Sequence, residues 1–246
     1  MDPKVRAHLV EELDLIISCA ASINFREHLH SALQTNYFGA VRMLDLALLC
    51  KKNPVLSHVS TAFVGSNQPY NSRCMEVINK DLCPDDWEVQ VKNLLAMDRE
   101  EVRKNEEKLK QGYYNTYTYT KNLAERHLER YRGKIRLVIN RPSGIIHCAE
   151  EPVPGWIDTV SAIGAVGYPL GMGFAQYEYL PKDIVFDFIP GDYTSNAILA
   201  STAHIATLPE GSMRIYQNTS GAVNLFSVPK FFMNAVDYLK YNPFDK

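Results

Sequence analysis

Short apolar runs recur along the chain at positions that predict buried strands. They cover residues 13–18, 55–64 and 135–140, and turn-forming residues bound them. Residues 28–50 and 117–131 carry apolar side chains at helical spacing, and Gly133 is a stop signal after the second of these stretches. The order strand, helix, strand, helix, strand predicts parallel strands joined by crossover helices. We therefore expect an α/β fold with a doubly wound, Rossmann-like parallel sheet.

The pattern changes in the second half of the chain. Residues 141–185 are rich in proline and glycine, which predicts loops and suits a substrate-binding insertion. Further elements are a helix over 192–204, a strand over 213–218 and an amphipathic helix over 228–241. Residues 98–110 are dense in charge with glutamate–lysine pairs at i, i+4, which predicts a solvated surface helix.

Composition narrows the function classes. The chain has 246 residues, 46% of them hydrophobic, and a net charge of −2, so it has a core but no basic excess for binding nucleic acid. No apolar run reaches the roughly 18 residues of a membrane-spanning helix, and the N-terminus is unlike a signal peptide. Five cysteines without a CxxC pair favour a reducing compartment and argue against a zinc site. His28 and His30 lack a nearby carboxylate or cysteine cluster, so we interpret them as surface residues rather than metal ligands.

A tyrosine and a lysine four residues apart are the first candidate for chemistry. Tyr117 and Lys121 fall on one face of a predicted helix, with Cβ atoms roughly 5–6 Å apart. A nearby ammonium group stabilises a phenolate, lowers the pKa of the phenol and makes it a better proton donor or acceptor at neutral pH. The same lysine can donate hydrogen bonds to ribose hydroxyls. Taken alone, the pattern is weak and more often reflects a partly exposed aromatic residue beside a surface lysine.

Two hydroxyl residues follow the second predicted strand. Ser60 and Thr61 lie at its carboxyl end, where open α/β sheets bind ligands. A hydroxyl there can donate to a carbonyl oxygen and stabilise developing negative charge. Because side chains alternate along a strand, only one of the two should face the site. We prefer Thr61 and keep Ser60 as the reserve; capping of the strand end is the alternative role.

Several segments together resemble a known superfamily. They are Ser18–Phe25, Asn36–Gly39, His58–Phe63, Tyr117–Lys121 and Arg141–Ser143, and they look like the extended short-chain dehydrogenase/reductases. Residues 151–158 and 235–244 narrow the resemblance to the male-sterility-like NAD-binding domain of fatty acyl-CoA reductases. The resemblance covers essentially the whole chain from about residue 10 onward.

The resemblance implies NADPH-dependent reduction of a long-chain acyl-CoA to an aldehyde and on to a primary fatty alcohol. Thr61 and Tyr117 would hold the carbonyl oxygen, Tyr117 would supply the proton, and Lys121 would bind the nicotinamide ribose and lower the pKa of Tyr117. The cofactor contacts implied, besides Tyr117 and Lys121, are Cys19, Ala20, Ala21, Asn36, Pro142 and Ser143. Asn36 is expected to brace the lysine, and Arg141 is either a site residue or a structural ion-pair partner.

Apolar residues after position 155 suit the fatty chain of such a substrate. Trp156 is either a core anchor or part of an apolar acyl channel. The other candidates for that channel are Ile157, Val160, Ile163, Phe174, Tyr177 and Tyr179.

The domain organisation follows from the resemblance. We expect residues 1–150 to form a partial NAD(P)-binding region with the catalytic motif, and residues 151–246 to form a substrate-binding region with returning elements of the same domain. The glycine-rich turn of a dinucleotide site has no counterpart before Leu13, and Gly171-Met172-Gly173 lacks the third glycine and follows no strand. We therefore expect a fragment of a longer reductase, without its N-terminal strand-turn-helix and without a C-terminal domain.

Two alternative hypotheses about the function remain at this point. One is a different extended short-chain dehydrogenase, such as a sterol dehydrogenase or a thioester or carboxylic acid reductase domain; another is a non-catalytic remnant of such an enzyme. The family resemblance implies an intracellular protein associated with peroxisomal or endoplasmic reticulum membranes. The sequence does not specify the oligomeric state.

Overall fold

The structure is a computed structural model that describes residues 2–69, 72–78, 86–159, 168–174, 185–221, 223–224 and 226–242. The chain forms two compact units, which are described separately. The first comprises Met1–Arg141 and Ile198–Gln217, and the second comprises Pro142–Ala197 and Asn218–Lys246. The boundary after Arg141 precedes the division expected at residue 150, and residues 198–217 return to the first unit.

The first unit is built around a four-stranded sheet. Its strands are β1 (Leu15–Ser18), β2 (Val55–Val59), β3 (Leu137–Pro142) and β7 (Met213–Asn218), in the spatial order β1-β2-β3-β7. β1 pairs with β2 in parallel, and β2 pairs with β3 in parallel. This arrangement confirms the predicted parallel sheet with crossover helices.

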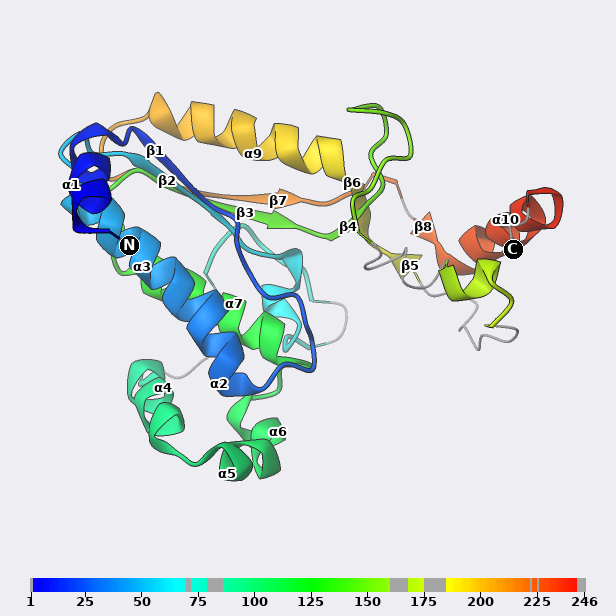
Figure 1. Ribbon diagram of the computed structural model, residues 1–246, viewed down its shortest axis with the longest axis horizontal. Coiled ribbons are helices and arrows are strands. Elements are labelled where there is room, and N and C mark those ends of the chain that lie inside the picture. Colours follow the sequence, from blue (N-terminus) through cyan, green and yellow to red (C-terminus); the bar gives the residue numbers. More distant parts are fainter. Residues whose placement is uncertain are drawn as a thin grey trace. The chain divides into compact units, whose positions relative to one another are not determined.

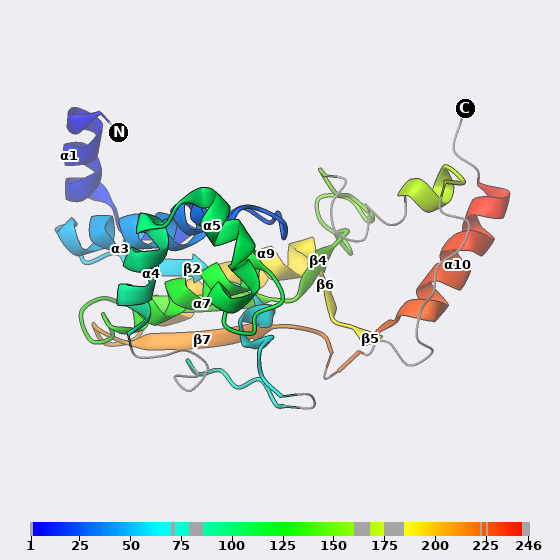
Figure 2. The same ribbon diagram turned by 90° about the horizontal axis from the view of Figure 1, so that it is seen from below.

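Helices cover both faces of this sheet (Figure 1). Those of the first unit are α1 (Pro3–Glu12), α2 (Leu29–Ala32), α3 (Phe38–Leu49), α4 (Trp87–Ala96), α5 (Arg99–Lys104), α6 (Glu106–Leu109), α7 (Thr116–Glu129) and the larger part of α9 (Gly191–Ala206). Figures 1 and 2 show α3 and α7 side by side along one face. On that face Leu44 and Leu128 pack with Leu56 of β2, whereas Ile205 of α9 packs on Val55 of the same strand. Adjacent residues of β2 thus bury opposite faces, as strand alternation requires.

Several predicted elements have different limits in the structure. The stretch expected to be one helix over 28–50 is α2, a π-helical turn over Leu33–Tyr37 and then α3. The strand expected over 55–64 stops at Val59, and a 3₁₀ turn over Ala62–Gly65 follows it. The hydrophobic pattern did not predict α1 or α4. The predicted strand over 213–218 has the same limits as β7.

The stretch over 98–110 departs from a simple surface helix. It forms α5 and α6, and Lys110 at its end is buried with an Nζ–Oε1 distance of 2.8 Å to Glu107. Val102 of α5 is fully buried with Trp87 and Leu94 of α4. These short helices therefore carry part of a core and are more than a solvated face.

The second unit contains two small sheets and a terminal helix. β4 (Gly144–Ile146) pairs in parallel with β6 (Phe188–Pro190), and β5 (Val185–Phe186) pairs antiparallel with β8 (Phe226–Ser227). The helix α10 spans Val228–Tyr241, as the amphipathic pattern predicted. Across the residues that the structure describes, no helix is both long enough and apolar enough to cross a bilayer.

The carboxylate of Asp192, in the first turn of α9, binds a loop of the second unit. Asp192 accepts hydrogen bonds from the backbone N–H groups of Ala149, Glu150 and Glu151 at 3.0, 2.8 and 3.1 Å. Burial raises the pKa of Asp192, but these bonds and one from Tyr193 outweigh it and lower the pKa to about 2. The carboxylate thereby fixes the loop after β4 to this helix end.

Candidate active site

Tyr117 and Thr61 meet although they come from distant parts of the chain. Asn115 caps α7 by accepting a hydrogen bond from the N–H of Thr118 at 2.8 Å, which places Tyr117 in the first helical turn. Thr61 is buried just after β2, and its Oγ1 accepts from the N–H of Phe63 at 3.3 Å. The Thr61 hydroxyl lies close enough to Tyr117 to lower the pKa of its phenol. The predicted pairing of hydroxyl and phenol is therefore present, with Thr61 rather than Ser60 as the partner.

Lys121 lies one helical turn after Tyr117 and is almost completely buried. Its Nζ donates to the carbonyl oxygen of Val59, the last residue of β2, at 2.8 Å. Burial lowers the pKa of Lys121 to about 8, although the side chains of Cys19 and Glu125 act in the opposite direction. The lysine is thus anchored to the carboxyl end of β2 and not to the protein surface.

The expected effect of Lys121 on the tyrosine is wrong. The pKa of Tyr117 is raised because burial disfavours the phenolate, and the nearby Thr61 hydroxyl opposes this only in part. The Cys19 side chain raises the pKa further. Tyr117 is therefore a protonated phenol at neutral pH, with a proton to donate but a weaker acid than an ordinary tyrosine.

Small residues follow the neighbouring strand β1. Cys19 and Ala20 are exposed and Ala21 is partly buried. Because Ser18 pairs with His58, Cys19 follows β1 level with the end of β2. The Cys19 side chain is close enough to raise the pKa of both Tyr117 and Lys121. Short side chains at the carboxyl ends of two adjacent parallel strands leave the backbone accessible to a ligand.

Asn36 fixes the segment that follows these small residues. Its Oδ1 accepts from the N–H of Ser22 at 2.8 Å, and its Nδ2 donates to the carbonyl oxygen of Ser22 at 3.1 Å. Nδ2 also lies 3.2 Å from Oγ1 of Thr120, the residue before Lys121. The hydrogen bonds found for Asn36 thus lead to the helix beside the lysine rather than to its Nζ. Asn36 belongs to the π-helical turn, a feature that is frequent at functional sites.

His58 and Ser60 lie beneath the catalytic helix. Leu56, His58 and Ser60 alternate onto one face of β2, and Leu56 packs with the residues of α3 and α7. Both ring nitrogens of His58 and the hydroxyl of Ser60 are buried, with no hydrogen-bond partner among the described residues. Burial, and then the charge of Lys121, lower the pKa of His58, so the ring is neutral.

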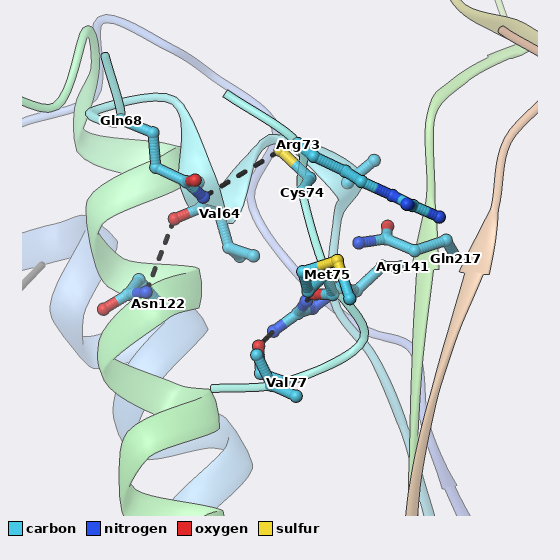
Figure 3. A pocket seen from close by; sticks show the side chains of 11 residues that line it. Val64, Gln68, Arg73, Cys74, Met75, Val77, Asn122, Arg141 and Gln217 are labelled. Atoms are coloured by element: carbon cyan, nitrogen blue, oxygen red, sulfur yellow. Dashed lines mark hydrogen bonds between the residues drawn. The ribbon is translucent and has the colours of Figure 1, made fainter. Parts of the chain in front are cut away.

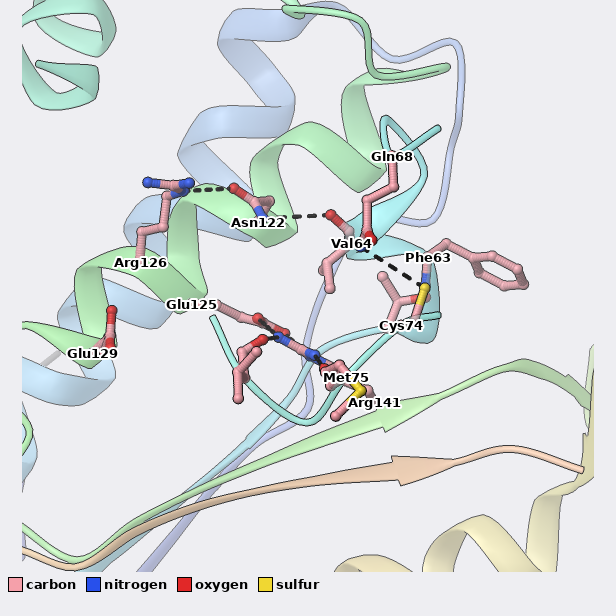
Figure 4. Close-up of polar contacts among 12 residues, drawn as sticks. Phe63, Val64, Gln68, Cys74, Met75, Asn122, Glu125, Arg126, Glu129 and Arg141 are labelled. Carbon is pink, nitrogen blue, oxygen red and sulfur yellow. Dashed lines mark hydrogen bonds and ion pairs between the residues drawn. The ribbon is translucent and has the colours of Figure 1, made fainter. Parts of the chain in front are cut away.

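Arg141 has a structural role. Its guanidinium forms two hydrogen bonds with the fully buried carboxylate of Glu125, at 2.9 and 2.6 Å (Figure 4). It also donates to the carbonyl oxygens of Met75 and Val77, both at 3.0 Å. This observation favours the ion-pair interpretation of Arg141. Sequence reasoning missed Glu125, which lies four residues after Lys121 on the same helix.

A small pocket lies beside this ion pair (Figure 3). Its volume is about 70 Å³, and its lining residues include Gln68, Arg73, Cys74, Asn122, Arg141 and Gln217. Asn122 donates to the carbonyl oxygen of Val64 at 3.4 Å and supports the wall next to Thr61. The pocket therefore adjoins the catalytic segments without including Thr61, Tyr117 or Lys121.

Pro142 and Ser143 belong to the second unit. Pro142 is the last residue of β3, and the N–H of Ser143 donates to the carbonyl oxygen of Asn218 at 3.1 Å. The Ser143 hydroxyl is buried and has no hydrogen-bond partner within the described part of the chain. Their contact with a nicotinamide stays a prediction.

The candidate acyl channel is only partly visible. Trp156 is 47% exposed and Phe174 is 80% exposed, so neither acts as a core anchor within its unit. Val160, Ile163, Tyr177 and Tyr179 lie outside the described residues.

The two histidines considered as metal ligands have backbone contacts instead. Nε2 of His28 lies 3.0 Å from the carbonyl oxygen of Arg99, and Nε2 of His30 lies 2.7 Å from that of Leu94. Within the described ranges, no group of three His, Cys, Asp or Glu residues could hold a metal ion.

The parallel sheet with helices on both faces gives the first unit a Rossmann-like fold, and Thr61, Tyr117 and Lys121 lie at its candidate site. An NAD-binding family model described as male sterility protein matches residues 1–198. The chain belongs to this family.

Curated relatives agree with this assignment. Fatty acyl-CoA reductase 1 of Xenopus laevis is 31% identical over 238 residues, covering 97% of this chain and 45% of the relative. The probable fatty acyl-CoA reductase 4 of Arabidopsis thaliana is 30% identical over 258 residues, covering 96% of this chain and 52% of the relative. The chain thus spans about half the length of the curated relatives it matches.

Solved structures share the fold. The terminal R domain of the myxalamid PKS-NRPS pathway matches with a TM-score of 0.65 at 19% identity, covering 98% of this chain and 50% of that one. RMD from Pseudomonas aeruginosa, solved with NADPH, matches with a TM-score of 0.58 at 15% identity, covering 92% of this chain and 65% of that one.

Proposed function

We propose that the chain forms part of an NADPH-dependent reductase that converts long-chain fatty acyl-CoA to the aldehyde and on to the primary fatty alcohol. The observation that carries the proposal is the placement of the Thr61 hydroxyl beside the Tyr117 phenol, with Lys121 one helical turn further on and bound to the carboxyl end of β2. The relatives named fatty acyl-CoA reductase support the acyl-CoA substrate.

The residues present fit a nicotinamide cofactor. Lys121 Nζ has three N–H donors and uses one on Val59, so others remain for ribose hydroxyls. The short side chains of Cys19, Ala20 and Ala21 leave room along the end of β1. Together these residues would hold the nicotinamide ribose and the adjoining part of the cofactor. When bound, the cofactor supplies the hydride that the reduction consumes.

Thr61 and Tyr117 act on the substrate carbonyl. Both hydroxyls can donate hydrogen bonds to its oxygen, which stabilises the negative charge that grows as the carbon is reduced. Tyr117, which is protonated at neutral pH, then transfers its phenolic proton to that oxygen. When the CoA thiolate leaves, the hydroxyl proton of the hemithioacetal returns to Tyr117 and the thiolate takes a proton from solvent, which yields the aldehyde. With a second equivalent of NADPH, the same two hydroxyls serve the reduction of the aldehyde to the alcohol.

The ammonium group of Lys121 would hold the nicotinamide ribose rather than lower the pKa of Tyr117. Its folded pKa of about 8 keeps it mostly charged at neutral pH. The bond to Val59 fixes its position on the strand that also leads to Thr61. The three side chains therefore keep their mutual arrangement between the two reductions.

The test is a reductase assay on this chain with NADPH and a saturated long-chain acyl-CoA, following NADPH oxidation and identifying products by mass spectrometry. We expect aldehyde and alcohol from the parent and loss of both with Thr61→Val. NADH in place of NADPH tests the cofactor preference. Oxidation of a sterol or another secondary alcohol with NADP⁺, without thioester reduction, would overturn the proposal in favour of a dehydrogenase.

A further inference from the structure

An exposed aromatic ring lies against the catalytic tyrosine. Phe25 is 58% exposed, and its ring centroid is 5.6 Å from that of Tyr117 at an interplanar angle of 41°. One side of the Phe25 ring is thus occupied by Tyr117, while much of the rest is open. Its place against Tyr117, rather than its exposure alone, makes the Phe25 ring a candidate for contact with a bound substrate.

The loop that carries Phe25 is tied down on both sides. Asn36 holds Ser22 through its N–H and its carbonyl oxygen, and Thr116 Oγ1 donates to the carbonyl oxygen of Glu27 at 3.0 Å. Thr116 directly precedes Tyr117, so the loop is fixed to the same helical turn as the catalytic phenol.

The tip of the loop is also ordered by its own turn. Asn24 Oδ1 accepts from the N–H of Arg26 at 3.0 Å, and the N–H of Glu27 donates to the carbonyl oxygen of Asn24 at 3.1 Å. Such an Asx turn presents the residue within it in a defined direction. Phe25 is therefore held in place while exposed, so a ligand that contacts it does not have to order the loop first.

We propose that Phe25 is a substrate-contacting residue that covers the first methylene groups of the acyl chain next to the reacting carbonyl. This inference rests on the proposed function, since it requires the carbonyl oxygen at the hydroxyls of Thr61 and Tyr117. A carbonyl carbon held there has a sulfur substituent on one side and an alkyl chain on the other. The apolar ring beside Tyr117 suits the alkyl side and offers nothing to the amides and phosphates of CoA.

The contact gives the site a preference for long acyl chains over short acyl groups such as acetyl. Methylene groups that pack on the ring are removed from water, which stabilises the bound thioester. An acetyl group has only one methyl group to place there. The ring also shields the reacting carbonyl from water. Phe25 thus favours longer substrates through contacts near the thioester, independent of any channel farther along the chain.

The experiment compares Phe25→Ala with the parent on a series from acetyl-CoA to long-chain acyl-CoA. We expect kcat/KM to fall about tenfold for butyryl-CoA and longer substrates, chiefly through KM, and to change less than about twofold for acetyl-CoA. Phe25→Leu should recover most of the loss. The control is Leu49→Ala, which removes another exposed apolar side chain at the end of α3 and should leave the whole series unchanged.

Other outcomes overturn the assignment. An equal loss for acetyl-CoA and long-chain substrates means that Phe25 only positions Tyr117. A weaker NADPH affinity in Phe25→Ala, measured by fluorescence titration, assigns the ring to the cofactor. An unchanged series means that the ring touches no substrate.

Equilibrium binding separates this inference from the proposed function. A non-reducible long-chain alkyl-CoA thioether is titrated against the parent and against Phe25→Ala in the presence of NADP⁺. Weaker binding to the variant supports the contact even if the parent reduces no thioester, in which case only the proposed function fails. Equal binding to both proteins, or none to the parent, overturns the contact.

Discussion

Arg141, near the carboxyl end of β3, forms a bidentate ion pair with Glu125 of α7, with N–O distances of 2.9 and 2.6 Å. Glu125 lies four residues after Lys121 on the same helix. The carboxylate of Glu125 is fully buried and the arginine side chain is 5% exposed. The pair joins α7 to β3 beside the candidate active site. It also connects that helix to the backbone at Met75 and Val77.

Removing the charge of Glu125 should strongly destabilise the protein. Glu125→Gln leaves the guanidinium of Arg141 buried without a counter-charge, which typically costs about 3–5 kcal/mol. We expect the free energy of unfolding, measured by urea denaturation, to fall by about 3 kcal/mol. Glu11→Gln is the control, because Glu11 pairs with Lys51 at the surface and its loss should cost less than about 1 kcal/mol. Equal effects of the two substitutions would contradict a stabilising role for the buried pair.

Tyr117→Phe should abolish most of the proposed reductase activity without unfolding the chain. The variant loses the proton donor but keeps the ring that packs on Phe25, and loss of an acid catalyst costs about 10²–10⁴-fold in rate. We expect kcat to fall at least about a hundredfold, with NADPH affinity close to that of the parent. Tyr114→Phe is the matched control, since this neighbouring tyrosine is 81% exposed. A Tyr117→Phe enzyme within tenfold of the parent would exclude the phenol as proton donor.

Stability should rise with pH where Lys121 loses its proton. The folded pKa is about 8 and the ordinary value is 10.5, so between these values the unfolded chain binds more protons than the folded one. The free energy of unfolding therefore increases with pH across this window. Relative to Lys121→Met, which has no charge to bury, the parent should gain about 2 kcal/mol between about pH 7 and pH 10. Urea denaturation at several pH values measures this difference, and a constant difference would show that Lys121 titrates normally.

Local patterning predicted the parallel sheet and the helix with the tyrosine and lysine, because both depend on apolar spacing within short windows. The limits of β2 were harder to predict. The apolar run continues to Val64, yet the strand ends at Val59 because Thr61 caps a 3₁₀ turn with its side chain and meets Tyr117. A tertiary contact thus outweighs the local preference for a longer strand.

Contacts between residues far apart in the chain could not be predicted from the sequence alone. Nothing in the spacing of Lys121 and Val59 indicates that the lysine binds that backbone oxygen. The raised pKa of Tyr117 likewise depends on burial, which a helical motif does not specify. The ion-pair partner of Arg141 could not be predicted for the same reason, because Glu125 is one of many acidic residues in the chain.

Asn36 should control the order of the loop that carries Phe25. Its amide makes three hydrogen bonds, two to the backbone of Ser22 and one to Thr120, and Asn36→Ala removes all of them from a buried place. Leaving such groups unpaired costs about 1–3 kcal/mol. We expect this loss of stability together with faster amide hydrogen exchange over residues 19–28.

The same substitution should reduce activity more than stability explains. Because the loop positions Phe25 against Tyr117, its loosening should lower kcat/KM for long-chain acyl-CoA about tenfold while acetyl-CoA turnover changes less. Gln34→Ala is the control, since Gln34 lies in the same π-helical turn but binds the exposed Arg42. If exchange in the loop stayed as slow as in the parent, or if Gln34→Ala had the same effect, Asn36 would not be the residue that orders the loop.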